Sequence, residues 1–289
     1  MTALNPKNIL IDREHFKHVY HGAINDVLGY WNSEMQAQIA LHNVGWCEGR
    51  TDFGAYLYYS ELRYWIAFDM MQRSGVFTSW CDVGGFLGAY PLALRRLGID
   101  VAMTECIEFY GNSYSGLFDY LQREGVEIIN IDPFEPGQKL VRAFDVVSVM
   151  AVLEHFPYSP KCFLEFVHGL TAGASNRVYL EVPNIAYWPR RWALLRGGTP
   201  LVKIGDIYKS AVPFIGHHHE YTWEELNELA GLAGFEVVNG ARYNYSFVGP
   251  WIKRFISDPL LTLMSICPSM RECLSVMLRK SDSDNGENV

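Results

Sequence analysis

The stretch from Trp80 to Tyr90 constrains the fold of this chain more than any other. It reads as a short apolar strand that ends in Asp82, then a turn with three glycines, then an apolar helical run. A second apolar run over 99–104 follows and ends in Glu105. Glycines let a backbone approach a ligand, a helix N-terminus adds positive potential, and an acid at the second strand tip accepts from ribose hydroxyls. We therefore predict a βαβ unit that holds a nucleotide-like ligand.

Strand and helix patterns alternate along most of the chain. The expected strands are, in chain order, 77–82, 99–104, 126–131, 144–149, 177–182, 235–238 and 271–280. Such alternation predicts a parallel sheet with helices on both faces. The last strand is joined to the one before it without a crossover, so it should run antiparallel. The predicted fold class is α/β, with a seven-stranded and mostly parallel sheet.

The chain is predicted to have three parts. These are a helical lead-in over 1–75, a main domain over 76–280 with insertions at 183–221 and 247–270, and a disordered tail over 281–289. The lead-in carries an amphipathic helical pattern over 56–68, and the tail has a disordered composition. The first insertion is rich in Pro, Trp, Tyr and His and is long for a connection, which indicates a lid or substrate-binding segment. It ends at a capping box formed by Thr222 and Glu225.

Composition and charge narrow the class of protein. The 289 residues are 49% hydrophobic and 19% charged, as in ordinary globular proteins. The net charge of −8 argues against a nucleic-acid substrate, which needs a broad basic footprint. The six cysteines are scattered with no C-x-x-C pair, and no apolar run is long enough for a signal peptide or a membrane span. We expect a cytoplasmic protein without a transmembrane segment.

Two further motifs follow the third and fourth expected strands. Asp132 ends the third run and precedes Pro133 and Phe134. Its carboxylate suits the exocyclic amine of an adenine and the phenyl ring suits the adenine face, although Asp-Pro is also an ordinary turn signal. The segment 144–156 reads as a buried strand that runs into a turn and a helix lying over the ligand. Both motifs place ligand contacts at the carboxyl edge of the sheet.

Together the motifs resemble the class I S-adenosylmethionine-dependent methyltransferases. The resemblance lies in D-x-G-x-x-x-G at 82–88, the acid at the next strand tip, and FDVV-x-x-x-x-VLEH at 144–155. Two more segments, 180–189 and 216–222, are similar to a bacterial subgroup associated with glycan, lipopolysaccharide and secondary-metabolite pathways. The resemblance covers about residues 53–280 and implies a Rossmann-like sheet.

The resemblance implies S-adenosylmethionine as the cofactor and assigns residues to it. The implied contacts are Arg63 (with Tyr64 as the alternative), Asp82, Gly84, Gly85, Gly88, Glu105, Asp132, Phe134, Met150 and Ala151. The glycine amides would surround the amino-acid tail, Asp82 would contact its ammonium group, and Glu105 the ribose. A solvated strand-end acid is the plain alternative for Glu105, and a solvated helix arginine for Arg63. Phe86 stands where the family most often has glycine, so its side chain should point away from the cofactor.

Methyl transfer needs an aligned acceptor and, for a hydroxyl, a group that removes its proton. Histidine suits this task near neutral pH. We predict that the base is His155, at the end of the fourth strand, or His219, on the lid. For His217 and His218, structural hydrogen bonding is the favoured alternative. No metal is expected, because adjacent residues on an extended chain point in opposite directions and no carboxylate has regular ligand spacing.

These observations predict an enzyme that methylates an oxygen of a small or carbohydrate-containing acceptor. The lid carries a basic-aromatic segment that could contact a sugar and a phosphate or could be a solvated helix face. Its members are Tyr187, Trp188, Arg190, Arg191, Trp192 and Arg196. The alternatives are an N-methyltransferase, a dinucleotide-binding oxidoreductase and a non-catalytic S-adenosylmethionine-binding protein. No nucleic-acid partner is expected, and a homo-oligomer is left open.

Overall fold

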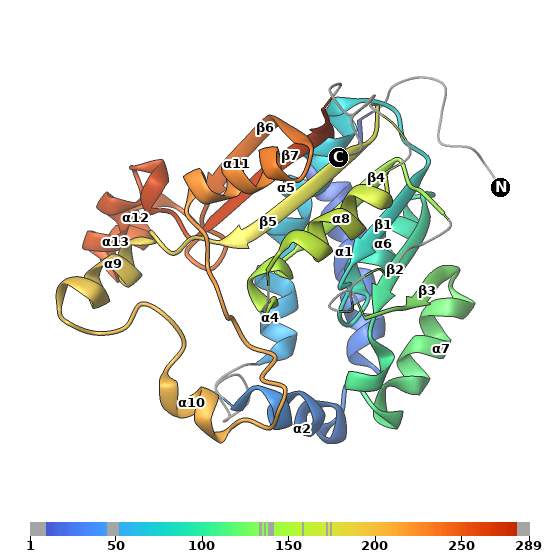
Figure 1. Ribbon diagram of the computed structural model, residues 1–289, viewed down its shortest axis with the longest axis horizontal. Coiled ribbons are helices and arrows are strands. Elements are labelled where there is room, and N and C mark those ends of the chain that lie inside the picture. The colour runs from blue at the N-terminus through green and yellow to red at the C-terminus, as the bar shows by residue number, and fades with distance from the viewer. Residues whose placement is uncertain are drawn as a thin grey trace.

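Seven strands form one sheet in the computed structural model, in the order β3-β2-β1-β4-β5-β7-β6 (Figure 1). They are β1 (Ser79–Val83), β2 (Asp100–Glu105), β3 (Val126–Asn130), β4 (Val146–Met150), β5 (Arg177–Pro183), β6 (Phe235–Tyr243) and β7 (Cys273–Lys280). Strands β1 to β5 pair in parallel, and β7 lies antiparallel between β5 and β6. The chain order reverses next to β1, and open α/β sheets bind ligands in the crevice at such a point. The predicted fold class is confirmed.

Helices surround the sheet on both faces. They are α1 (Arg13–Leu28), α2 (Ser33–His42), α4 (Phe53–Tyr59), α5 (Glu61–Ser74), α6 (Ala89–Arg96), α7 (Ser115–Arg123), α8 (Lys161–Gly169), α9 (Trp188–Leu195), α10 (Ile204–Lys209), α11 (Trp223–Leu232), α12 (Trp251–Ser257) and α13 (Pro259–Met264). Four short 3₁₀ turns are described as well: η1 (Ile107–Phe109), η2 (Asn112–Tyr114), η3 (Leu153–His155) and η4 (Pro268–Met270). The structure describes residues 10–44, 52–132, 135, 137, 142–157, 159–171, 173 and 175–281.

Two apolar clusters hold the layers together, one on each face of the sheet. Successive side chains of a strand point to opposite faces, so β1 sends Trp80 to one cluster and Cys81 to the other. The Trp80 cluster includes residues of α1, α2, α4, α5, α6 and α7, and the Cys81 cluster includes residues of α8 and α11. The helices of the predicted lead-in therefore share a core with the sheet. The division into parts at residue 75 stays a prediction.

Most strands lie within two residues of their predicted limits, and two elements differ more. Strand β6 continues to Tyr243, beyond the predicted end at 238, because it pairs with β7 along this length despite a register shift between Val237 and Asn239. Asn239 and Gly240 are residue types that favour turns, so the sequence pattern does not predict the second half of this strand. The helix expected over 56–68 is divided in two at Ser60, which ends α4 and precedes α5. The Ser60 hydroxyl makes no capping hydrogen bond in the described part of the chain, so the sequence carries no side-chain signal for this break.

The two insertions hold four short helices. Helices α9 and α10 lie within 183–221, and α12 and α13 lie within 247–270. Figure 1 shows α9, α12 and α13 grouped at one end of the molecule, whereas α10 lies near α2. The capping box at the start of α11 is confirmed: Thr222 Oγ1 accepts from the Glu225 amide, and the Glu225 carboxylate accepts from the Thr222 amide. Among the described residues, no helix combines the length and hydropathy that crossing a membrane requires.

Candidate active site

A cavity of about 940 Å³ lies beyond the carboxyl ends of the parallel strands. Its lining includes residues at or just after the ends of β1 to β5, such as Gly84, Glu105 and Met150. The opposite wall comes from the first insertion, including Arg190 and His217. Cavities of roughly 300–1,000 Å³ suit small molecules and cofactors. The insertion that was predicted to be a lid therefore closes a ligand-sized space over the strand ends.

The glycine turn after β1 has two left-handed glycines with distinct roles. Gly84, at φ 71°, lines the cavity, and a β-carbon there would lie 2.7 Å from Val152 Cγ2. Gly88, at φ 74°, precedes α6, and a β-carbon there would lie 2.4 Å from Leu121 Cδ1. Neither Gly85 nor Gly88 is among the described residues that line the cavity. Gly84 is thus placed against the ligand space, and Gly88 shapes the turn and its packing on α7.

Phe86, the departure from the family pattern, adopts φ 53° although it is not glycine. Its ring packs near Phe53 of α4, with the ring centroids 5.9 Å apart. Its backbone amide donates to the Glu105 carboxylate at the tip of β2. The side chain is therefore held by a neighbouring aromatic ring while the amide points toward the acid.

Glu105 lies where the sequence predicted, at the tip of β2 and in the cavity wall. Its Oε2 accepts from Tyr110 Oη at 2.8 Å, and its other oxygen accepts from the Phe86 amide. Burial raises the pKa of Glu105 to about 8, although the hydrogen bonds from these two donors act to lower it. Each carboxylate oxygen has two lone pairs, so both can accept one more hydrogen bond from a diol.

Asp82 is buried behind the turn, and it is not among the described residues that line the cavity. Its Oδ1 accepts from Ser148 Oγ at 2.5 Å, and Ser148 in turn accepts from Trp80 Nε1 at 2.7 Å. Burial raises its pKa to about 7. The structure therefore does not bring Asp82 directly to the ligand space, and the predicted ammonium contact would need water between them.

Three more predicted cofactor residues lie together at the strand ends. Asp132, Met150 and Ala151 all line the cavity, and Ala151 adopts φ 56° directly after β4. Its amide donates to the Glu181 carbonyl at 3.1 Å, which fixes this unusual backbone. Phe134, the proposed adenine partner, lies outside the described residues.

Arg63 is buried in the cavity wall rather than solvated. Its Nε donates to Glu181 Oε1 at 2.9 Å, its Nη2 lies 2.5 Å from the same oxygen, and its Nη1 donates to Tyr56 Oη at 3.0 Å. The Tyr245 ring lies over the guanidinium at 4.7 Å. Glu181 balances the charge of the guanidinium, and these contacts fix Arg63 in the cavity wall, where the sequence predicted a cofactor contact.

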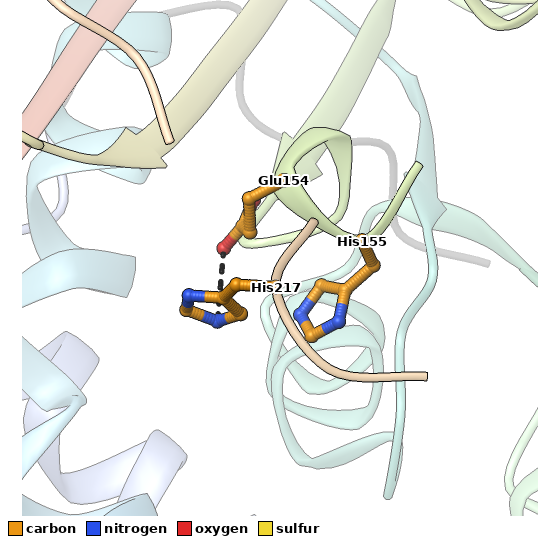
Figure 2. A group of neighbouring side chains, drawn as sticks. All are labelled: Glu154, His155 and His217. Carbon is orange, nitrogen blue, oxygen red and sulfur yellow. Dashed lines mark ion pairs between the residues drawn. The ribbon is translucent and has the colours of Figure 1, made fainter. Parts of the chain in front are cut away.

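Glu154, His155 and His217 form a cluster in the same cavity (Figure 2). One nitrogen or oxygen from each side chain lies within 4.8 Å of the others. The rings of His155 and His217 are perpendicular, with centroids 4.8 Å apart, and His217 Nε2 lies 3.8 Å from Glu154 Oε1. Neither carboxylate oxygen of the fully buried Glu154 has a hydrogen-bond partner among the described residues. Burial raises the pKa of Glu154 to about 8 and lowers the pKa values of both histidines.

The segment around His217 is fixed by buried partners. His217 Nδ1 lies 2.8 Å from Glu220 Oε1, and Glu220 also pairs with Arg190 of α9. The His218 amide donates to the Glu154 carbonyl at 2.7 Å, and His155 Nδ1 lies 2.6 Å from the Ile215 carbonyl oxygen. These bonds join the end of the lid to the turn after β4.

The structure does not bring His219 to the cavity. Its side chain is exposed, its Nε2 lies 3.6 Å from Glu225 Oε1, and it is not among the described lining residues. His217 lines the cavity, whereas His218 and His219 are both exposed, so the side chains of this segment do not follow strict alternation. His217 therefore occupies the place that the sequence analysis gave to His219.

Sequence reasoning missed Glu154 and Glu220 as site residues, although each is adjacent to a histidine that it singled out. Both are buried, and each faces His217. One reason for expecting no metal was that no carboxylate has regular ligand spacing along the sequence. That reason does not hold in three dimensions, since Glu154 reaches the lid from the turn after β4. The spacing of the three ligand atoms could hold a metal ion.

The strand-end residues fit S-adenosylmethionine. Glu105 and Asp132 present carboxylates to the cavity, Gly84 leaves room for the ligand, and Arg63 supplies a buried cation. When bound, this cofactor supplies an electrophilic methyl group on a sulfonium centre. The fold and the cavity together define a methyltransferase that uses S-adenosylmethionine.

The chain belongs to the methyltransferase domain family, whose sequence profile matches residues 62–239. The dinucleotide-binding oxidoreductase and the non-catalytic binding protein are therefore set aside. The comparison with curated proteins gave no match.

Two solved structures share the fold. One is Burkholderia thailandensis 1,6-didemethyltoxoflavin-N1-methyltransferase with bound 1,6-didemethyltoxoflavin and S-adenosylhomocysteine, at 16% identity and a TM-score of 0.51, covering 95% of this chain and 92% of that one. The other is the N-methyltransferase NodS from Bradyrhizobium japonicum with S-adenosylhomocysteine, at 12% identity and a TM-score of 0.52, covering 86% of this chain and 99% of that one. At these identities the likeness is one of fold.

Proposed function

We propose that this methyltransferase transfers a methyl group to a hydroxyl oxygen of a small or carbohydrate-containing acceptor, in glycan, lipopolysaccharide or secondary metabolism. The observation that carries the proposal is the pair of histidines side by side in the cavity wall, His155 and His217. Burial lowers the pKa of each, so both imidazoles are neutral near pH 7 and can accept a proton. A hydroxyl acceptor needs such a group, because it must lose a proton as the bond to carbon forms.

We assign the base to His155. Its Nδ1 lies 2.6 Å from a carbonyl oxygen, so Nδ1 carries the ring proton and Nε2 keeps a free lone pair. His217 is the second candidate, with its Nδ1 directed to Glu220 and its Nε2 directed to Glu154. His219 is not proposed, since it lies outside the cavity. The histidine that accepts the proton becomes cationic.

The acceptor is placed between the strand ends and α9. Tyr187, Pro189 and Arg190 line the cavity there, whereas Trp192 and Arg196 of the same basic-aromatic segment are exposed. An aromatic face and a guanidinium suit a sugar ring that carries an acidic group. Only part of the predicted segment is therefore assigned to the acceptor.

An amine acceptor is the second candidate. The two similar solved structures are named as N-methyltransferases, although at their identities this says little about the acceptor of this chain. A neutral His155 would serve an ammonium acceptor in the same way, by taking its proton before the transfer.

We also propose that the enzyme works in the cytoplasm. The cysteines that the structure describes, at 81, 106, 162, 267 and 273, are free. Free thiols fit a reducing compartment.

The test uses matched acceptor pools. The purified chain is incubated with S-adenosylmethionine and either hydroxyl compounds or their amino analogues, for example sugars and amino sugars, and release of S-adenosylhomocysteine is measured. We expect the unchanged chain to turn over the hydroxyl pool and the His155→Ala variant to lose this turnover. Turnover confined to the amino pool would contradict O-methylation and favour the second candidate.

A further inference from the structure

Helices α9 and α12 carry apolar side chains that the fold does not cover. Both helices are fully described, and neither has a buried residue. Each spans about two turns, a length that is not stable alone in water, so tertiary packing normally holds such helices by an apolar face. Here the apolar side chains face outward instead. Trp192 is 44% exposed and Leu195 72%, and Ile252 and Ile256 are 67% and 76% exposed.

The helices that carry the exposed apolar side chains pack together and bring these side chains to one end of the molecule. Helix α13 contacts both α12 and α9, and Figure 1 shows the three helices at one end of the molecule. We call these helices the cap. Its exposed apolar residues are Trp192, Leu194 and Leu195 of α9, Trp251, Ile252 and Ile256 of α12, Leu260 and Leu263 of α13, and Ile266 after it. Monomeric soluble proteins rarely expose a contiguous apolar surface of this kind unless it binds something.

The cap is net basic, in a chain whose net charge is −8. Residues 188–196 and 247–270 hold five Lys and Arg and one acid, Asp258. That acid is half-buried and caps α13 by accepting from the Leu261 amide at 2.8 Å. In these two fully described segments, the exposed charges are Arg196 and Lys253, both basic. A second copy of the chain on this face would bring like charges together, whereas an anionic surface complements them.

The aromatic residues of the cap are of the type found at membrane surfaces. Trp251 stacks on Phe255 one helical turn away, with centroids 4.8 Å apart, and Trp188 stacks on Trp192 in the same way. Helices that lie in a bilayer interface combine Trp, Phe and Leu on one face with Lys and Arg beside them. Tryptophan prefers the headgroup region because its ring is apolar while its N–H is a donor.

We propose that the cap docks on the surface of an anionic lipid bilayer, with α9 and α12 lying in the interface. The apolar side chains enter the headgroup boundary, and Arg196 and Lys253 contact lipid phosphates. Tyr187 and Arg190, which line the cavity, lie at the start of α9, so docking brings the cavity close to the bilayer. The enzyme then meets acceptors that are carried at a lipid surface. That last consequence rests on the proposed function, and the docking does not.

The test is flotation of the full chain with vesicles of phosphatidylcholine, with and without phosphatidylglycerol. We expect binding to the anionic vesicles that weakens at high salt. Ile252→Glu/Ile256→Glu should lower the vesicle partition coefficient by about ten-fold or more, and Lys253→Glu by about five-fold. The matched control is Val76→Glu/Leu232→Glu, which changes two equally exposed apolar residues elsewhere and should bind vesicles as the unchanged chain does.

Binding of S-adenosylhomocysteine is measured in parallel for every variant, and it should be unchanged because all these side chains are exposed. Failure of the unchanged chain to bind anionic vesicles would overturn the docking. An equal loss of vesicle binding in the control variant would also overturn it. A third contrary result would be a chain that binds no vesicles but is a dimer in light scattering, which Ile252→Glu/Ile256→Glu converts to a monomer. Failure of the unchanged chain to bind S-adenosylhomocysteine would instead contradict the cofactor and leave the docking intact.

Discussion

The two walls of the cavity are built in different ways. The strand wall, formed by Gly84, Glu105, Asp132, Met150 and Ala151, follows from the ends of neighbouring parallel strands, whose register fixes it. The histidine wall, formed by Glu154, His155, Arg190 and His217, exists only because the end of the lid returns across the turn after β4. The strand wall is where we place the cofactor, and the histidine wall is where we place the chemistry.

The largest expected effect is on the histidine wall. His155→Ala should lower kcat by roughly 10²–10⁴-fold because the acceptor hydroxyl loses its proton acceptor. Steady-state turnover with an accepted hydroxyl compound measures it. His219→Ala is the matched control and should retain full activity, since that side chain is exposed and outside the cavity. Equal loss in both variants would contradict the geometry of the wall.

The glycine turn behind the strand wall gives a stability test. Gly88→Val should lower the free energy of unfolding by about 2–4 kcal/mol, because the new side chain meets Leu121 and the backbone is left-handed. Gly197→Val is the control, since Gly197 adopts φ 76° and a β-carbon there would have no described heavy atom within 4 Å beyond its chain neighbours. Denaturant unfolding of both variants separates the clash from the strain. Equal destabilisation by Gly88→Val and Gly197→Val would contradict a packing role for Gly88.

The buried carboxyls of the two walls predict a pH dependence of stability. Glu154 has a pKa raised from 4.5 to about 8, so within that window the folded chain binds more protons than the unfolded chain, and stability falls as pH rises. Between pH 6.5 and 7.5, a histidine with a lowered pKa still binds part of a proton in the unfolded chain, and the resulting slope of opposite sign is common to the unchanged chain and the variant. Glu154→Gln should make the slope shallower by at most about 1.4 kcal/mol per pH unit. Denaturant unfolding across this range measures it.

The exposed Glu224→Gln is the control for this slope and should leave it unchanged. A slope that Glu154→Gln does not alter would mean that the buried carboxyl is already ionised in the folded chain.

The smallest expected effect is that of chelation. Removal of divalent ions should leave turnover unchanged, because methyl transfer needs alignment and a proton acceptor, both supplied by side chains. Turnover is measured before and after treatment with a chelator. Loss of activity that a divalent ion restores would assign a metal to Glu154, His155 and His217.

Most of the fold and the strand wall could be predicted from the sequence, because they depend on short patterns. The position of an acid at a strand end, such as Glu105, follows directly from where the strand ends. Arg63 was predicted as a cofactor contact, but its partner Glu181 lies far along the chain and no local pattern joins the two. Which histidine of the run points inward depends on how the lid packs. The residue before the run, Gly216, is buried, and only the fold shows that His217 follows it into the cavity.

The central claim is that the two walls do separate work, and titration of S-adenosylhomocysteine by calorimetry tests it most directly. At about pH 8.5, above the pKa of Glu105, the carboxylate is ionised and can accept from the ribose. We predict that Glu105→Gln weakens binding by about 1–3 kcal/mol, the range for loss of a charged hydrogen-bond partner, while His155→Ala binds as the unchanged chain does. Unchanged affinity in Glu105→Gln, or a comparable loss in His155→Ala, would contradict this division of the cavity.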